Sequence, residues 1–281
     1  MPQTINTNLA SLNAQRNLNS SQSSLATSMQ RLSSGMRVNS AKDDAAGLAI
    51  AERMNAQVRG MNVAVRNAND GISLAQTAEG ALSKVGDSLQ RMRELAVQAR
   101  NATNSSSDKD SLNKEFAQLQ KEISRVLGGT SFNGKHILGT DATTLTFQIG
   151  ANVTVDDVIE IDTVNMGSDT TITAVTTGAT IGATADASAI ATVISNIDGA
   201  INTVNDTRAT FGATQSRFDA IISNLQQSVE NQAAARSRIM DADYAQETAN
   251  MSRAQILQQA GNAMVAQANQ LPQQVLRLLG Q

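Results

Sequence analysis

The sequence predicts a mainly α-helical protein in which the N- and C-terminal regions form a long antiparallel helical bundle or coiled coil. From Met54 to Ala96, apolar residues recur at steps of three or four, which is the spacing of a helix that packs lengthwise on other helices. A heptad row from Ile190 to Leu225 repeats this spacing near the other end of the chain. Aromatic residues make up only 2% and Trp is absent, so aliphatic side chains must form the core.

The N-terminal region predicts one helix, a connector and a second, longer helix. Residues 1–36 carry an apolar stripe at helical spacing, and Gly35 interrupts it. Ser40 followed by Asp43 resembles a capping box, which predicts a connector over about residues 33–43. The long helix is then expected to begin near Ala45 and to end near Arg100.

A third helix and small β-hairpins are expected next. The polar segment 101–108 predicts a turn in which Ser107 or Asp108 caps the following helix, and Gly128 and Gly129 end that helix. Asn133-Gly134 is a tight-turn signal, and strand-like segments follow at 144–149 and 157–164. These segments predict hairpins that lie against the helices.

Few large apolar residues occur in the segment 165–188, for which a loop or a hairpin is expected. The segment 237–251 is predicted to be a second connector. The apolar stripe after it lies on a nearly uncharged background, and Pro272 is expected to kink or break that last helix.

Three regions follow from this pattern. An inner terminal-helix domain is expected from residues 1–43 and 241–281, a helical rod with β-hairpins from 44–164 and 189–240, and a short variable segment at 165–188. Both chain ends combine an apolar stripe with an uncharged polar background, which predicts that they pack on each other. One stripe recovers too little free energy to order a whole end, so we expect the ends to be disordered or marginal in the monomer and to fold on assembly.

Composition argues against several classes of function. The net charge of −3 gives no electrostatic case for nucleic acid or an anionic membrane, and no apolar run approaches a membrane span. The chain has no Cys, and its one histidine, His136, lies beside an Asn-Gly turn without clustered metal ligands. No phosphate-binding glycine loop occurs. We therefore expect neither an enzyme nor a cofactor.

Several long motifs resemble bacterial flagellin, the subunit of the flagellar filament. They are RLSSGMRVNSAKDDAAGLAIAERM at 31–54, NANDGISLAQTAEGAL at 67–82, LQRMRELAVQARNATNS at 89–105 and FQIGAN at 147–152. The resemblance implies a structural subunit that self-assembles into a filament for motility. The N-terminus shows no cleavable signal peptide, which alone suggests a cytoplasmic protein. The resemblance instead implies export through the flagellar type III apparatus to the extracellular filament.

The resemblance also implies partners. These are other flagellin subunits, an export chaperone, the filament cap and hook-junction proteins, together with Toll-like receptor 5 and cytosolic immune sensors in hosts. It assigns receptor or subunit contact to Gln90, Arg91, Leu95 and Glu115. Arg91 and Leu95 lie one helical turn apart, and Leu95 is expected off the seam.

Side chains expected to pack in the filament core share an apolar character and a place near the chain ends. They are Ile5, Leu9, Leu12, Leu25, Leu32, Leu257, Met264, Leu271, Val275, Leu276, Leu278 and Leu279.

Two alternatives remain at this point. A hook–filament junction protein shares the terminal helices, although its match to the motifs at 31–54 and 67–82 would be less complete. A signalling coiled coil, such as a receptor hairpin, would explain the heptads. It would not explain the uncharged ends, and it would need a membrane span or a sensor domain.

Overall fold

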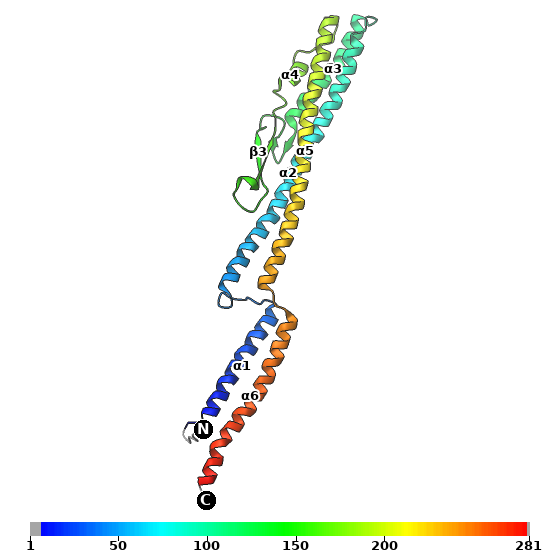
Figure 1. Cartoon of the computed structure of the whole chain (residues 1–281). Helices are drawn as coiled ribbons and strands as arrows, with labels where there is room; N and C mark the ends of the chain where they lie inside the picture. Colours follow the sequence, from blue (N-terminus) through cyan, green and yellow to red (C-terminus); the bar gives the residue numbers. More distant parts are fainter. Residues whose placement is uncertain (1–6, 280–281) are drawn as a thin grey trace. The chain divides into compact units, whose positions relative to one another are not determined.

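The computed structural model describes the backbone of residues 7–279 and the side chains of residues 7–270 (Figure 1). Contacts divide the chain into two compact units. The terminal unit contains the two chain ends, up to Ala56 and from Asn231 onward. The central unit is Gln57–Glu230.

The described residues are mainly helical, as predicted, with two small antiparallel sheets. In chain order the elements are α1 (Leu9–Ser34), α2 (Ala45–Ala99), α3 (Ser106–Gly129), β1 (Ser131–Phe132), β2 (Lys135–His136), β3 (Thr144–Gln148), the 3-10 turn η1 (Val155–Asp157), β4 (Val158–Asp162), α4 (Thr170–Thr176), α5 (Ala187–Met240) and α6 (Tyr244–Leu279).

In the terminal unit, α1 and α6 pack side by side, which confirms that the two chain ends pair (Figure 1). Small residues line their seam. Ser11 and Ala268 are buried, and the Ser11 hydroxyl donates to Asn269 Oδ1 at 2.8 Å. A Cβ added to Gly261 would lie 3.2 Å from Leu18 Cδ1. The two backbones therefore approach closely.

The first connector forms as predicted. Gly35 ends α1 with φ +70°, the left-handed conformation that glycine adopts without strain. Met36 then forms an isolated antiparallel bridge with Asp241, and the Arg37 amide donates to Met240 O at 2.7 Å. Val38 is buried beside Met240.

The second connector is shorter than expected. Instead of residues 237–251, only Asp241–Asp243 separates α5 from α6. The polar residues on either side continue the two helices. The short connector bonds to the first one, where the Ala242 amide donates to Gly35 O at 2.9 Å. Pro272 is expected to kink or break the last helix; it does not break it, since α6 is a single helix through that residue.

The starts of α2 and α3 lie close to their predicted positions, but the capping residues differ. The carboxylate of Asp43 accepts from the Ser40 amide and hydroxyl, and this pair closes the turn before α2. Asp44 caps α2 itself by accepting from the Gly47 amide at 2.7 Å. For α3 the N-cap is Ser105, and Asp108 completes a capping box with it rather than capping the helix itself.

The core of the central unit follows the predicted seams of α2 and α5. The buried heptad residues of α5 are Ile190, Ile197, Val204, Phe211 and Phe218. Phe218 covers Gly71 of α2, and its ring meets the edge of Phe147 at a centroid distance of 5.7 Å.

Both predicted hairpins are present. Asn133 (φ 48°) and Gly134 (φ 80°) form the positive-φ turn between β1 and β2. β3 and β4 pair antiparallel, from Thr144 opposite Asp162 to Gln148 opposite Val158. This second hairpin lies against α2 (Figure 1), where Asn67 Nδ2 donates to Gln148 O at 2.9 Å.

The segment 165–188 contains more structure than the loop or hairpin expected for it. α4 begins after Asp169, whose carboxylate accepts from the Thr171 amide. Ile172, Val175 and Ile181 are buried in the core that also contains α3 residues. α4 itself buries only Ile172 and Val175, one helical turn apart, although the composition around them is that of a loop.

Candidate assembly surfaces

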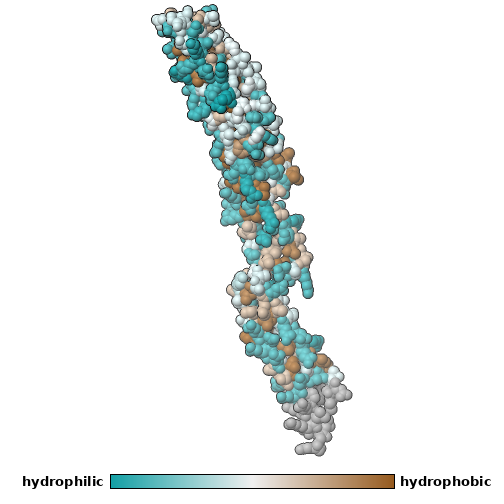
Figure 2. All heavy atoms as spheres, turned by 180° about the vertical axis from the view of Figure 1, so that it is seen from behind, coloured by the Kyte–Doolittle hydropathy of each residue, from teal (hydrophilic) through white to brown (hydrophobic). Residues whose placement is uncertain are grey.

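The α1–α6 pair buries small residues in its seam and leaves large apolar side chains in solvent. Figure 2 shows hydrophobic residues among hydrophilic ones on one face of the molecule. Among the side chains that the structure describes, the exposed large hydrophobic residues of α1 and α6 are Leu9, Leu12, Met29, Tyr244, Ile256, Leu257 and Met264. Burial of such a side chain contributes about 1.5–3 kcal/mol, so this surface is suited to a protein partner.

Of the residues expected to pack in a filament core, four are solvent-exposed in the single chain: Leu9, Leu12, Leu257 and Met264. Leu25 and Leu32 are half-buried. Ile5 lies outside the described residues. The α6 backbone includes the remaining five, but their side chains lie outside the described part: Leu271, Val275, Leu276, Leu278 and Leu279.

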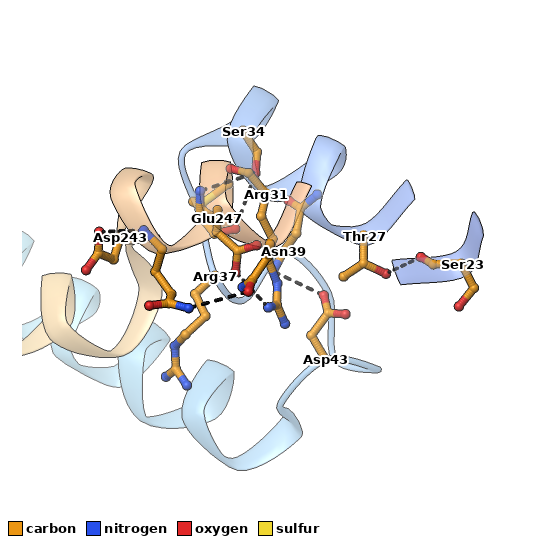
Figure 3. Close-up of polar contacts among 12 residues, drawn as sticks. Ser23, Thr27, Arg31, Ser34, Arg37, Asn39, Asp43, Asp243 and Glu247 are labelled. Carbon is orange, nitrogen blue, oxygen red and sulfur yellow. Dashed lines mark hydrogen bonds and ion pairs between the residues drawn. The ribbon is translucent and has the colours of Figure 1, made fainter. Parts of the chain in front are cut away.

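One charged pair joins the inner ends of α1 and α6. Arg31 Nη1 donates to Glu247 Oε1 at 3.1 Å, and Figure 3 shows the two side chains lying against each other. Glu247 is 7% exposed. The sequence interpretation missed this pair. The sequence indicates the pair only by an Arg on α1 and a Glu on α6, each near the connector that follows or precedes an uncharged stripe.

The Ser40–Asp43 turn adds a fixed negative charge to the first connector. The hydrogen bond from the Ser40 hydroxyl lowers the pKa of Asp43 below its ordinary value. Asp43 is therefore ionised at neutral pH.

On the central unit, the structure brings three of the four expected contact residues to the surface. Gln90, Arg91 and Glu115 are exposed, and Arg91 Nε donates to Glu115 Oε1 at 2.8 Å. A second bond joins Arg91 Nη1 to Glu94 Oε2 at 2.9 Å. Because both carboxylates bind the guanidinium, with Glu115 contributing most, the pKa of Arg91 is raised above its ordinary value.

Leu95 does not belong to this surface, and its expected position off the seam is wrong. It is 1% exposed and lies in the core cluster with Phe116 and Ile123 of α3. The seam of Leu89, Met92 and Ala96 predicts that α2 packs along one line. The core contains residues of α3 as well as α5, so a wider face of α2 is buried.

The described residues contain no group of three or more His, Asp or Glu side chains placed to hold a metal ion. In the same part of the chain, no helix is both long enough and apolar enough to cross a membrane.

In comparison with known proteins, the N-terminal and C-terminal regions of the chain match the same protein family. Residues 5–143 match the family described as the bacterial flagellin N-terminal helical region, and residues 194–279 match the C-terminal helical region. A flagellin of Halalkalibacterium halodurans is 46% identical over 275 residues, covering 98% of this chain and 99% of the relative. A flagellin of Bacillus subtilis is 43% identical over 303 residues, covering 98% of this chain and 99% of the relative.

A solved structure of Bacillus cereus flagellin is 34% identical with a TM-score of 0.49, covering 61% of this chain and 94% of that one. The two family matches and the near-complete coverage of the curated relatives decide the assignment. The chain belongs to the bacterial flagellin family.

Proposed function

We propose that this chain, a structural subunit of the flagellar filament and not an enzyme, assembles by burying the outward apolar faces of α1 and α6 between neighbouring copies. The observation that carries the proposal is that the α1–α6 pair buries small residues and exposes large apolar ones. Ser11, Gly261 and Ala268 lie in or beside its seam, whereas Leu257 and Met264 are 50% and 58% exposed. Copies related head to tail form an open helical polymer, which is the geometry of a filament.

Replacing Leu257 and Met264 together with Gln tests the proposal. Both side chains are half-exposed or more, so the monomer should keep its helical circular dichroism and its unfolding midpoint. Filament growth from purified seeds should fall strongly, because each lost apolar contact weakens every subunit interface.

The matched control exchanges the same two residues for Met and Leu, which keeps the apolar area. The control should assemble like the natural chain. Normal assembly of the Gln variant would refute the proposal.

Export and assembly partners follow from the same family. We infer export through the flagellar type III apparatus, and binding to an export chaperone, the filament cap and hook-junction proteins. The apolar C-terminal residues Leu276, Leu278 and Leu279 are the candidate contacts. Their replacement by Ala should abolish filament formation while the helical signal of the remaining chain persists. Normal filaments would contradict this role.

We also infer that the monomer is recognised by Toll-like receptor 5 and by cytosolic immune sensors in hosts. The exposed side chains of Gln90, Arg91 and Glu115 support a receptor contact on α2 and α3. Leu95 would contribute only by supporting the helix from inside, because it is buried.

The same helix provides a control for this contact. Arg93 is as exposed as Arg91 and makes a comparable ion pair, to Asp198 at 2.6 Å. Arg91→Ala should reduce signalling through Toll-like receptor 5, whereas Arg93→Ala should leave it near normal. Equal signalling by the two variants would move the contact elsewhere.

Two observations bear on the alternatives. Both terminal family regions are those of flagellin, which favours the filament subunit over a hook–filament junction protein. The signalling coiled coil would need a membrane span or a sensor domain, and no described segment supplies a helix that could cross a membrane.

A further inference from the structure

We propose that a polar groove between α1 and α6 receives carboxamide side chains, Asn or Gln, from the terminal helices of a neighbouring subunit. This inference deepens the proposed function, on which it rests. Apolar contacts would supply affinity between copies, and this groove would fix how one copy is seated on the next.

The groove lies within the terminal unit and has a volume of about 430 Å³. Its α1 wall is a row of hydroxyl side chains that includes Ser21, Ser24 and Thr27. Arg31 and Glu247 line it at the end near the connectors, and Arg253 lies farther along α6. Ala254 and Leu257 also line the α6 side, so the hydroxyl and charged groups form only part of the wall.

The hydroxyl wall presents acceptors. Ser21 Oγ donates to Asn17 O at 2.9 Å, Ser24 Oγ to Ser20 O at 3.0 Å, and Thr27 Oγ1 to Ser23 O at 3.1 Å. The last of these bonds is drawn in Figure 3. Each hydroxyl proton is therefore used within α1, and the oxygen lone pairs remain free to accept from an incoming N–H group.

The end of the groove contains one unpaired acceptor and one unpaired donor. Glu247 Oε1 accepts from Arg31 Nη1, but within the described part of the chain neither Glu247 Oε2 nor Arg31 Nε has a hydrogen-bond partner. Both atoms are buried, and Glu247 as a whole is 7% exposed. Buried polar atoms of this kind are costly when they stay unpaired.

A carboxamide matches this arrangement better than other side chains. Its NH2 group can donate to the hydroxyl wall. Once the Arg31 side chain turns toward the groove, the same carboxamide can also pair with Glu247 Oε2 through its NH2 group and with Arg31 Nε through its carbonyl. An ionised carboxylate has no donor for Glu247 Oε2, and an ammonium group has no acceptor for Arg31 Nε. An apolar group would leave both buried atoms unpaired.

A second copy of this chain can supply such side chains. Arg16 is the only charged residue among the first 30, and Arg277 is the only one from residue 254 to the C-terminus. The exposed surfaces of α1 and α6 instead carry amides, among them Gln15, Asn19, Gln22, Gln255, Gln259 and Asn262. Any neighbour that packs through its terminal helices therefore brings amides to the groove.

The first test removes the acceptors of the wall with the triple variant Ser21→Ala, Ser24→Ala, Thr27→Val. These hydroxyls bond only to the backbone of α1, so the monomer's unfolding midpoint should not fall. The critical concentration for seeded filament growth should rise about tenfold, as expected when several intersubunit hydrogen bonds are lost.

The matched control is Ser73→Ala, Thr77→Val, Ser111→Ala. These hydroxyls make the same bond to the carbonyl four residues earlier, but they lie outside the groove. The control should leave the critical concentration unchanged. An unchanged value for the groove variant, or an equal rise in both variants, would overturn the inference.

Different results would refute the groove inference and the proposed burial of the apolar faces on assembly. If the groove variant assembles normally while the Gln variant of Leu257 and Met264 does not, only the groove inference is wrong. If the Gln variant assembles normally, the proposed function itself is wrong.

The second test identifies the occupant. The chain has no Cys, so Ser24→Cys offers a single attachment point for a benzophenone crosslinker. Filaments grown from mixed ¹⁵N-labelled and unlabelled monomers distinguish crosslinks between copies from those within one. We expect crosslinks between copies to Asn- or Gln-containing peptides of α1 or α6. Crosslinks only within one chain, or to the central unit of a neighbour, would refute the inference.

Discussion

Gly71→Ala is the sharpest test of how the central unit is packed. An added Cβ would lie 2.6 Å from Phe218 Cζ and 2.8 Å from Phe218 Cε2. These distances are too short for carbon atoms in contact, and Phe218 is fully buried, so its ring has no free space to move into. The ring also meets Phe147 of β3 edge-on. Movement of the ring would therefore disturb the hairpin as well.

Two opposing effects set the size of the change. Overpacking of a tight core costs about 1–3 kcal/mol. Replacing Gly by Ala within a helix contributes about 0.5–1 kcal/mol in the other direction. Together they give a net loss of about 0–2.5 kcal/mol in the free energy of unfolding.

The same helix provides the control. Nothing lies within 4 Å of a Cβ added to Gly80, so Gly80→Ala should show the helix effect alone and stabilise by up to about 1 kcal/mol. Urea unfolding of both monomers, followed by circular dichroism at 222 nm, measures the difference. Equal stabilisation by Gly71→Ala and Gly80→Ala would refute the packing of Phe218 on α2.

Three further predictions concern other parts of the fold. Leu95→Ala should cost about 2–5 kcal/mol in the unfolding of the monomer, because it leaves a cavity in the core; a surface residue would cost little. Gly261→Leu should separate α1 from α6 and expose the α6 amides near Leu18 to faster hydrogen exchange, whereas unchanged exchange would contradict the close seam. The hydrogen bond from the Ser105 hydroxyl lowers the pKa of Asp108. The stabilisation of α3 by ionised Asp108 is therefore present at neutral pH and is lost as the pH falls through the lowered pKa. Asp108→Asn should remove this acid-dependent fraying of the α3 N-terminus, measured by hydrogen exchange.

Helix periodicity predicted the fold because each long helix contributes a regular apolar seam. The row from Ile190 to Phe218 is buried, and α2 begins at Ala45 as expected. Turn chemistry predicted the first hairpin equally well, since Asn133 and Gly134 both adopt positive φ. Both features depend on residues close together in the sequence, so the spacing and type of those residues predict them.

Predictions failed where the burial of a residue depends on an element other than the two helices of the predicted seam. Leu95 is expected off the seam of α2, but it lies inside the core that includes α3. The two buried residues of α4, Ile172 and Val175, are too few to show a helical period in the sequence, and they are buried by packing on the core that includes α3. The Arg31–Glu247 pair joins residues far apart in sequence, so spacing alone could not reveal it.

The domain boundaries proposed from the sequence coincide with the helix ends near residues 43 and 241. The compact units instead divide within α2 and α5, after Ala56 and before Asn231. A continuous helix gives no sequence signal at such a division, because its apolar spacing continues across it.

Methionine oxidation in monomers and filaments tests most directly whether assembly buries the outward faces of α1 and α6. Met29 and Met264 are 55% and 58% exposed on these two helices, whereas Met92 and Met166 are fully buried in the central unit. Limited treatment with hydrogen peroxide, followed by peptide mass spectrometry, reports each site separately. We predict that Met29 and Met264 oxidise rapidly in the monomer and become strongly protected in the filament, while Met92 and Met166 resist oxidation in both states. Equal oxidation of Met29 and Met264 in monomer and filament would contradict burial of this surface on assembly.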